Sequence, residues 1–223
     1  MQQFATSAPV SLVLDIAAGQ VRLIAADRTD TTVEVRPENA GKSKDVKAAE
    51  QTEVTYADGI VRITTPEAGN QMLGAAGAIE VTVQLPAGSR VDAKAAAAEY
   101  HGVGRLGDVT LEGGHRAVKL DETASARLTA LDADVTIGRL TGAAEISTQR
   151  GSIRITEAVG GDVALTTQQG DITVATAPGT SATLDARTEY GRVHNALANT
   201  AGADAALNIR ATTSYGDITA RTA

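Results

Sequence analysis

The sequence contains no cysteine and no tryptophan, and aromatic residues make up only 2% of its 223 residues. The absence of cysteine excludes disulfides, thiolate zinc sites and thiol catalysis. Aromatic side chains usually supply much of the volume of a wide protein core. Because hydrophobic residues still reach 43%, alanine, valine, isoleucine and leucine must line the interior. We therefore expect a narrow space between facing sheets.

A basic surplus and a long apolar run are also absent. The net charge is −7 and the pI is about 5.0, whereas a nucleic-acid-binding domain typically has a basic patch or a pI above about 9. No segment approaches the length of roughly 18 apolar residues that a transmembrane helix needs. Residues 1–19 lack a basic start, and Ser11 and Asp15 interrupt their apolar stretch, so they do not resemble a signal peptide. We expect no nucleic-acid partner, no membrane insertion and a cytoplasmic location.

One short pattern recurs through the second half: a small or turn residue, then a polar residue, then an aliphatic anchor. The anchors are Val103, Val118, Val135, Ile153, Ile172, Val193 and Ile218. Their spacing drifts between 15 and 25 residues, which favours a solenoid whose coils share two short strands and differ in loop length. Apolar residues alternate with polar ones around the anchors, as expected for half-buried strands. A β-sandwich is the competing interpretation, since it also has short strands separated by turns.

The sequence therefore predicts an all-β fold, a β-solenoid or flattened β-helix of short stacked strands. We expect residues 1–223 to form a single domain. Residues 1–89 would provide longer strands that begin the same sheets and cap one end, and residues 90–223 would form the repeat coils. Val135, Ile153 and Ile172 should lie directly above one another in the thin interior.

Three segments resemble a known family: the run from Ile79 to Ser89, the repeated Gly-Asp-Ile or Gly-Asp-Val elements, and the ending from Ser214 to Ile218. The chain resembles the DUF4097 family of bacterial β-strand-repeat proteins, described as "putative adhesin", and its Ala- and Gly-rich acidic composition is similar to actinobacterial members. The resemblance covers essentially the whole chain. It implies the repeat fold and an adhesin-like role, and it supplies no catalytic residue.

Histidine and aspartate are the residues that could form a metal site. His101, His115 and His194 occupy different positions relative to their anchors, so they do not line one face, and we interpret them as surface residues. Five aspartates occupy coil corners: Asp108, Asp134, Asp162, Asp171 and Asp217. Capping of the turns is favoured over calcium binding, because serine and arginine interrupt any carboxylate ladder. No metal ligand and no cofactor is predicted.

Tyrosine provides the candidate surface site. Tyr100, Tyr190 and Tyr215 each lie three residues before an anchor. Tyr190 and Tyr215 fall on adjacent coils, so their rings would stack about 4.8 Å apart, the spacing of neighbouring strands. The favoured interpretation is a corner ladder that stabilises the C-terminal coils. The alternative is a shallow aromatic platform for a sugar or a protein partner.

No nucleophile elbow, phosphate-binding loop or zinc-protease motif occurs in the sequence, so no catalytic residue is predicted. The first functional hypothesis is a non-enzymatic structural or interaction protein, adhesin-like or scaffold-like, that associates with itself or with a protein partner. On that hypothesis the coil that ends near Ala223 should be poorly capped. The alternative is a carbohydrate-binding or carbohydrate-active β-helix protein.

Overall fold

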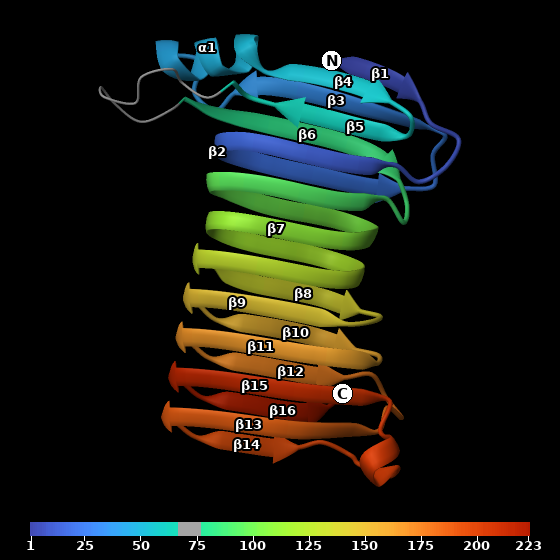
Figure 1. Cartoon of the computed structure of the whole chain (residues 1–223), viewed down its shortest axis with the longest axis vertical. Helices are drawn as coiled ribbons and strands as arrows, with labels where there is room; N and C mark the ends of the chain where they lie inside the picture. The colour runs from blue at the N-terminus through green and yellow to red at the C-terminus, as the bar shows by residue number, and fades with distance from the viewer. Residues whose placement is uncertain (67–76) are drawn as a thin grey trace.

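A computed structural model describes residues 1–66 and 77–223, and it shows a tall stack of flattened coils (Figure 1). The N-terminal elements are β1 (Gln2–Ala5), β2 (Ser11–Ala26), β3 (Asp30–Pro37), α1 (Ser43–Gln51), β4 (Glu53–Ala57), β5 (Ile60–Thr64) and β6 (Ala78–Pro86). The middle elements are β7 (Arg90–Asp132), β8 (Asp134–Leu140), β9 (Ala144–Arg150), β10 (Ile153–Ala158), β11 (Gly161–Gln169) and β12 (Ile172–Thr176). The last elements are β13 (Ala182–Tyr190), β14 (Val193–Ala196), the short 3-10 helix η2 (Gly202–Asp204), β15 (Leu207–Tyr215) and β16 (Ile218–Thr222).

The strands form two facing layers. Sheet 1 runs in the spatial order β1-β3-β6-β2-β7-β8-β10-β12-β16-β14, and sheet 2 consists of β4, β5, β2, β7, β9, β11, β15 and β13. The long strands β2 and β7 bend round the corners and contribute to both sheets. Neighbouring coils pair in parallel, so each coil places its residues directly above the equivalent residues of the next.

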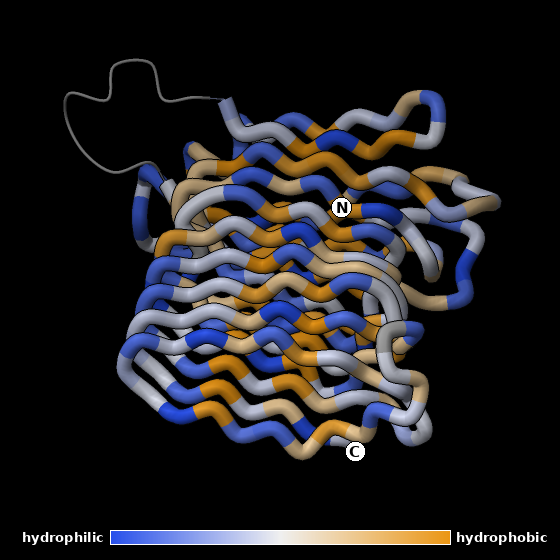
Figure 2. The backbone as a smooth tube through the Cα atoms, turned by 60° about the horizontal axis from the view of Figure 1, so that its bottom comes forward, coloured by the Kyte–Doolittle hydropathy of each residue, from blue (hydrophilic) through white to orange (hydrophobic). Residues whose placement is uncertain are grey.

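The aliphatic anchors from Val118 onward form one continuous column, as the sequence predicts. Val103 is 38% exposed, so its prediction as an interior anchor is wrong. Ile153 pairs with Val135 on one side and with Ile172 on the other. The column continues through Ile218 to Val193. Along each strand hydrophobic and hydrophilic residues alternate (Figure 2), so one set of side chains fills the interior and the other faces solvent. The solenoid interpretation is therefore confirmed.

A Thr-x-x-Gly corner that sequence analysis did not single out closes the C-terminal coils. The Thr167 hydroxyl donates to the Gly151 carbonyl of the neighbouring coil, and Thr213 bonds to Gly170 in the same way, both at 3.0 Å. Gly170 has φ +153°, and a Cβ atom there would lie 2.2 Å from the Gly151 carbonyl oxygen. The glycine is therefore needed for close approach, and the buried threonine satisfies a carbonyl that the corner would otherwise leave unpaired.

The chain does not add its last coils in sequence order. Strands β15 and β16 lie between β11–β12 on one side and β13–β14 on the other. The coil that ends near Ala223 is therefore an interior coil, and the expectation that it would be poorly capped is wrong. The last coil of the stack is β13–β14. The chain forms this coil first, one strand position beyond β11–β12, and β15–β16 then fills the position between them.

The opposite end is closed by structures that leave the parallel pattern. Strand β1 pairs antiparallel with β3, β3 pairs antiparallel with β6, and β4 forms an antiparallel hairpin with β5. Phe4 of β1 and Tyr56 of β4 meet across the two sheets, with ring centroids 5.3 Å apart. Helix α1 packs against β3 and β6 at the same end (Figure 1).

The position of the β15–β16 coil between two other coils, which we call the inserted coil, leads to a testable prediction about stability. Ile218 is 1% exposed and Val193 is 46% exposed, although they are partners in one column. We expect Ile218→Ala to lower the free energy of unfolding by about 2–5 kcal/mol, because a buried isoleucine leaves a cavity. Val193→Ala should cost about 1 kcal/mol or less. Urea unfolding followed by circular dichroism measures both, and equal costs would contradict the order of the coils.

Candidate interaction site at the C-terminal end

Two stacked tyrosine rings stand at one corner of the last coils. Tyr190 of β13 pairs with Tyr215 of β15, and their ring centroids lie 4.9 Å apart with an angle of 5° between the ring planes. The side chains are 65% and 54% exposed. The stacking expected from the sequence is therefore observed, and it follows from parallel pairing, which sets equal corner positions one strand spacing apart.

Tyr100 does not belong to this exposed pair. It lies within β7 opposite Val21 of β2 and is 1% exposed. Burial is the main cause that raises the pKa of Tyr100 above its usual value, and the nearby charge of Asp15 adds to it. The three-residue offset fails here because residues around Tyr100 continue along a strand, whereas Tyr190 and Tyr215 end theirs at a corner.

The corner aspartates cap turns, and three of them form one ladder with a serine. The Asp134 carboxylate accepts a hydrogen bond from the Ser152 amide at 2.8 Å. The Ser152 hydroxyl accepts from the Asp171 amide at 3.3 Å, and Asp171 accepts from Asp217 at 2.8 Å. Asp217 in turn accepts from the Arg192 amide at 2.8 Å. Each side chain thus satisfies a backbone donor of the next coil, and the ladder ends at Arg192.

Asp108 and Asp162 lie on the other side of the molecule. Asp108 accepts a hydrogen bond from the Ser125 hydroxyl at 2.6 Å, and Asp162 accepts from the Asn208 amide group at 3.2 Å. The five aspartates therefore do not share one corner.

The histidines lie far apart. His101 pairs with Arg22 near the N-terminal end of sheet 1, whereas His194 pairs with Thr219 at the edge strand β14. His115 belongs to β7, and its side chain lies outside the described part of the structure. Within residues 1–66 and 77–223, no group of three or more His, Cys, Asp or Glu side chains is arranged to hold a metal ion.

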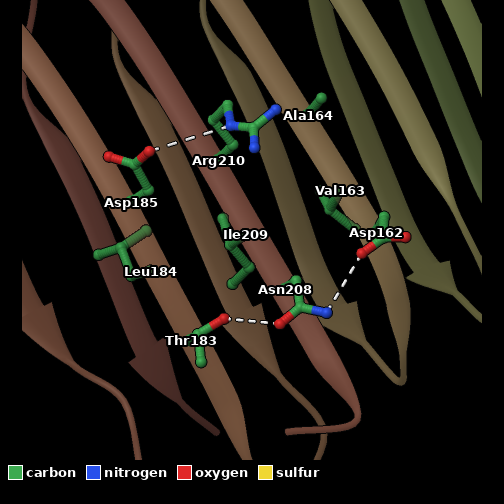
Figure 3. A pocket seen from close by; sticks show the side chains of 9 residues that line it. All are labelled: Asp162, Val163, Ala164, Thr183, Leu184, Asp185, Asn208, Ile209 and Arg210. Atoms are coloured by element: carbon green, nitrogen blue, oxygen red, sulfur yellow. Dashed lines mark hydrogen bonds and ion pairs between the residues drawn. The ribbon is translucent and has the colours of Figure 1, made fainter. Parts of the chain in front are cut away.

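A shallow hollow of about 640 Å³ lies on the outer face of sheet 2 (Figure 3). Thr183 donates to Asn208 at 2.8 Å, and Asn208 donates to Asp162 at 3.2 Å. Arg210 forms an ion pair of 3.9 Å with Asp185. These residues come from β11, β15 and β13, so the hollow depends on the inserted coil. Sequence analysis missed it because the three segments are not consecutive.

Charged side chains on the outer faces pair across neighbouring coils. Lys94 lies 3.2 Å from Glu112, and Arg127 lies 3.2 Å from Glu145. Parallel stacking sets these positions side by side, so opposite charges in one column attract each other. Exposed pairs of this kind contribute little stability.

The fold and the corner site define a class: a two-sheet parallel β-solenoid with an aromatic pair at one end. The chain belongs to the Toastrack DUF4097 family, whose model matches residues 10–222. No curated protein matches the chain. None of the helices within the described residues is both long and apolar enough to span a membrane.

Solved structures share the fold at low sequence identity. A crystal structure from Bacteroides fragilis, named a "putative adhesin", is 13% identical with a TM-score of 0.58, and the match covers 100% of this chain and 95% of that one. A "putative cell adhesion protein" from Clostridium sporogenes is 12% identical with a TM-score of 0.45, covering 100% and 98% of the two chains. At such identities the first likeness shows the fold alone.

The raised pKa of Tyr100 predicts a pH effect. An unfolded-chain tyrosine ionises near pH 10, and Tyr100 keeps its proton above that pH while the chain is folded. The folded state therefore binds the proton more tightly, so this contribution to stability is complete below about pH 10 and is lost as the pH rises further. In an alkaline titration, ionisation of Tyr100 should coincide with unfolding, as tyrosinate absorbance measured beside circular dichroism would show.

Tyr100→Phe is the matched control for the titration. It should remove the late component of the tyrosinate absorbance and leave the remainder in place. Complete ionisation of all tyrosines before the circular dichroism signal changes would contradict the burial of Tyr100.

Proposed function

We propose that this chain is a non-enzymatic, adhesin-like interaction protein that binds a protein partner through the Tyr190–Tyr215 pair. The observation that carries the proposal is the parallel stack of two rings, each more than half exposed, at 4.9 Å. Rigid aromatic side chains provide large contact area at low entropic cost. Here each ring restricts its neighbour, and the paired strands fix both, so little freedom remains to be lost on binding.

The way in which the acidic side chains are paired supports a binding role. Acidic side chains on the outer faces pair with cations of the next coil, such as Glu157 with Arg139 and Asp132 with Arg150. The corner carboxylates accept backbone amides instead. These arrangements engage carboxylates in holding coils together. The net charge of −7 favours a partner that is not a nucleic acid.

Carbohydrate binding is the second candidate, and the hollow on sheet 2 favours it. The chain of hydrogen bonds from Thr183 through Asn208 to Asp162 sets alternating donors and acceptors on an open face. A ligand rich in hydroxyl groups suits such a surface. The names of the solved relatives concern adhesion, which either a protein or a glycan partner would satisfy.

The two candidates are separated by a binding experiment with defined probes. We expect the chain to bind to one or more members of a panel of immobilised extracellular-matrix proteins, and we expect the Tyr190→Ala/Tyr215→Ala variant to lose about tenfold or more in affinity, as hot-spot aromatics typically do. Surface plasmon resonance measures this loss. Leu131→Ala removes another exposed apolar side chain from the same solenoid and should leave the affinity unchanged.

A printed array of oligosaccharides forms the second arm. Binding there that is lost in Asn208→Ala, but kept in the double tyrosine variant, would establish the carbohydrate candidate instead. Cleavage of any arrayed oligosaccharide would contradict a non-enzymatic role. Matrix-protein binding that survives the double tyrosine substitution would contradict the aromatic platform.

A further inference from the structure

Strand β13 is an edge with unused hydrogen-bonding capacity. Within the described residues it pairs with β15 alone. The Leu207 amide of β15 donates to the Ser181 carbonyl at 3.3 Å, whereas the Ala182 amide points the other way, to the Ala198 carbonyl at 3.1 Å. Because the backbone groups of consecutive strand residues point to alternate sides, those of Leu184, Ala186 and Thr188 point away from β15. A free edge of this kind is a template for another strand.

The interior of the solenoid is also open at this end. Val193 continues the anchor column but is 46% exposed, and Leu184 and Ala186 are only partly buried. At the opposite end Phe4, Tyr56 and helix α1 cover the core. Pairing at β13 would therefore cover both backbone groups and apolar side chains.

The side chains along this edge complement a second copy of themselves. The outward residues of β13 alternate in charge: Asp185, Arg187 and Glu189 are all exposed. In an antiparallel pair about a two-fold axis at Thr188, Arg187 lies opposite the partner's Glu189, and the symmetry repeats the contact. An axis at Ala186 would set Arg187 opposite the partner's Asp185. Opposite charges directly across a strand pair stabilise it.

The two ends of β13 select between these two registers. The Ala182 amide donates to the Ala198 carbonyl at 3.1 Å, and the Ser181 hydroxyl accepts from the amides of Thr200 and Ala201 at 3.1 and 3.0 Å. The segment that contains η2 thus occupies this part of the strand. An axis at Ala186 uses only the open residues Leu184, Ala186 and Thr188, whereas an axis at Thr188 would need Tyr190, whose carbonyl already accepts the Gly216 amide at 3.1 Å.

We propose that β13 pairs antiparallel with β13 of a second copy of this chain, centred on Ala186, and joins two solenoids end to end as a closed dimer. A two-fold axis perpendicular to the sheets also brings β14 beside its counterpart. Both sheets then continue through the interface, and both interiors are closed. The interface is isologous, so it ends at two copies.

The proposal is tested on the full chain by sedimentation velocity over a wide range of concentration. We expect a reversible monomer–dimer equilibrium without larger species. Arg187→Glu puts three acidic residues along the edge, so it should raise the dimer dissociation constant about tenfold or more. Arg154→Glu makes the same charge change on an exposed residue of β10, inside sheet 1, and should leave the equilibrium unchanged.

Two double variants report the register. Asp185→Arg with Arg187→Glu exchanges the charges that face each other about Ala186, and it should restore the dimer. Arg187→Glu with Glu189→Arg exchanges those that face each other about Thr188, and it should not. The reverse result would overturn the Ala186 centre, and failure of both to restore the dimer would overturn charge pairing across β13.

A backbone variant separates edge pairing from side-chain effects. Ala186→Pro removes an amide that faces the free edge, and proline is tolerated on edge strands, so the monomer should stay folded by circular dichroism while the dimer disappears. A monomer at every concentration, a dimer unaffected by Arg187→Glu and Ala186→Pro, or growth into longer assemblies would each overturn the proposal. Tyr215→Ala lies off the edge, so loss of ligand binding with an intact dimer shows that the two sites are separate.

Discussion

The parallel backbone ladder between coils is the constraint on which the structure depends. Each coil must bond to the next at one strand spacing, so every position becomes a column of equivalent positions. Neighbouring side chains in a column must therefore be compatible: both apolar, hydrogen-bonded to each other, or of opposite charge. The interior column of Val135, Ile153, Ile172 and Ile218 meets this requirement with aliphatic groups. Among the largest fully buried side chains of the described residues, Tyr100 is aromatic and the others are leucine and isoleucine.

The corners meet the same constraint with polar groups. Threonine hydroxyls bond to glycine carbonyls of the neighbouring coil, and aspartate or serine side chains bond to the amides of the next. Both ladders satisfy backbone groups that a tight turn leaves without a strand partner. On the outer faces the columns hold opposite charges, as in Lys94 with Glu112.

The two ends of the stack differ in how their unpaired strand edges are covered. The N-terminal end leaves the parallel pattern and closes with antiparallel strands, an aromatic contact and a helix. The C-terminal end keeps the parallel pattern up to β13 and β14 and therefore presents backbone groups and an incompletely covered interior. The exposed tyrosine pair stands beside that edge, so ligand binding and self-pairing concern adjacent but different surfaces.

The sequence by itself determined the columns. Spacing relative to the anchors predicted the stacked valines and isoleucines and the contact between Tyr190 and Tyr215. In parallel pairing, residues at the same distance from their anchors become neighbours on adjacent coils. The same rule misplaced Tyr100, since an offset does not say whether a residue ends a strand or continues it. Only the tertiary structure decided the order of the last coils, because β15 pairs with β11 on one side and with β13 on the other, which the order of these segments along the chain does not show. That order buries Ile218, exposes β13 and assembles the hollow around Asn208, so the surfaces open to partners follow from packing rather than from local pattern.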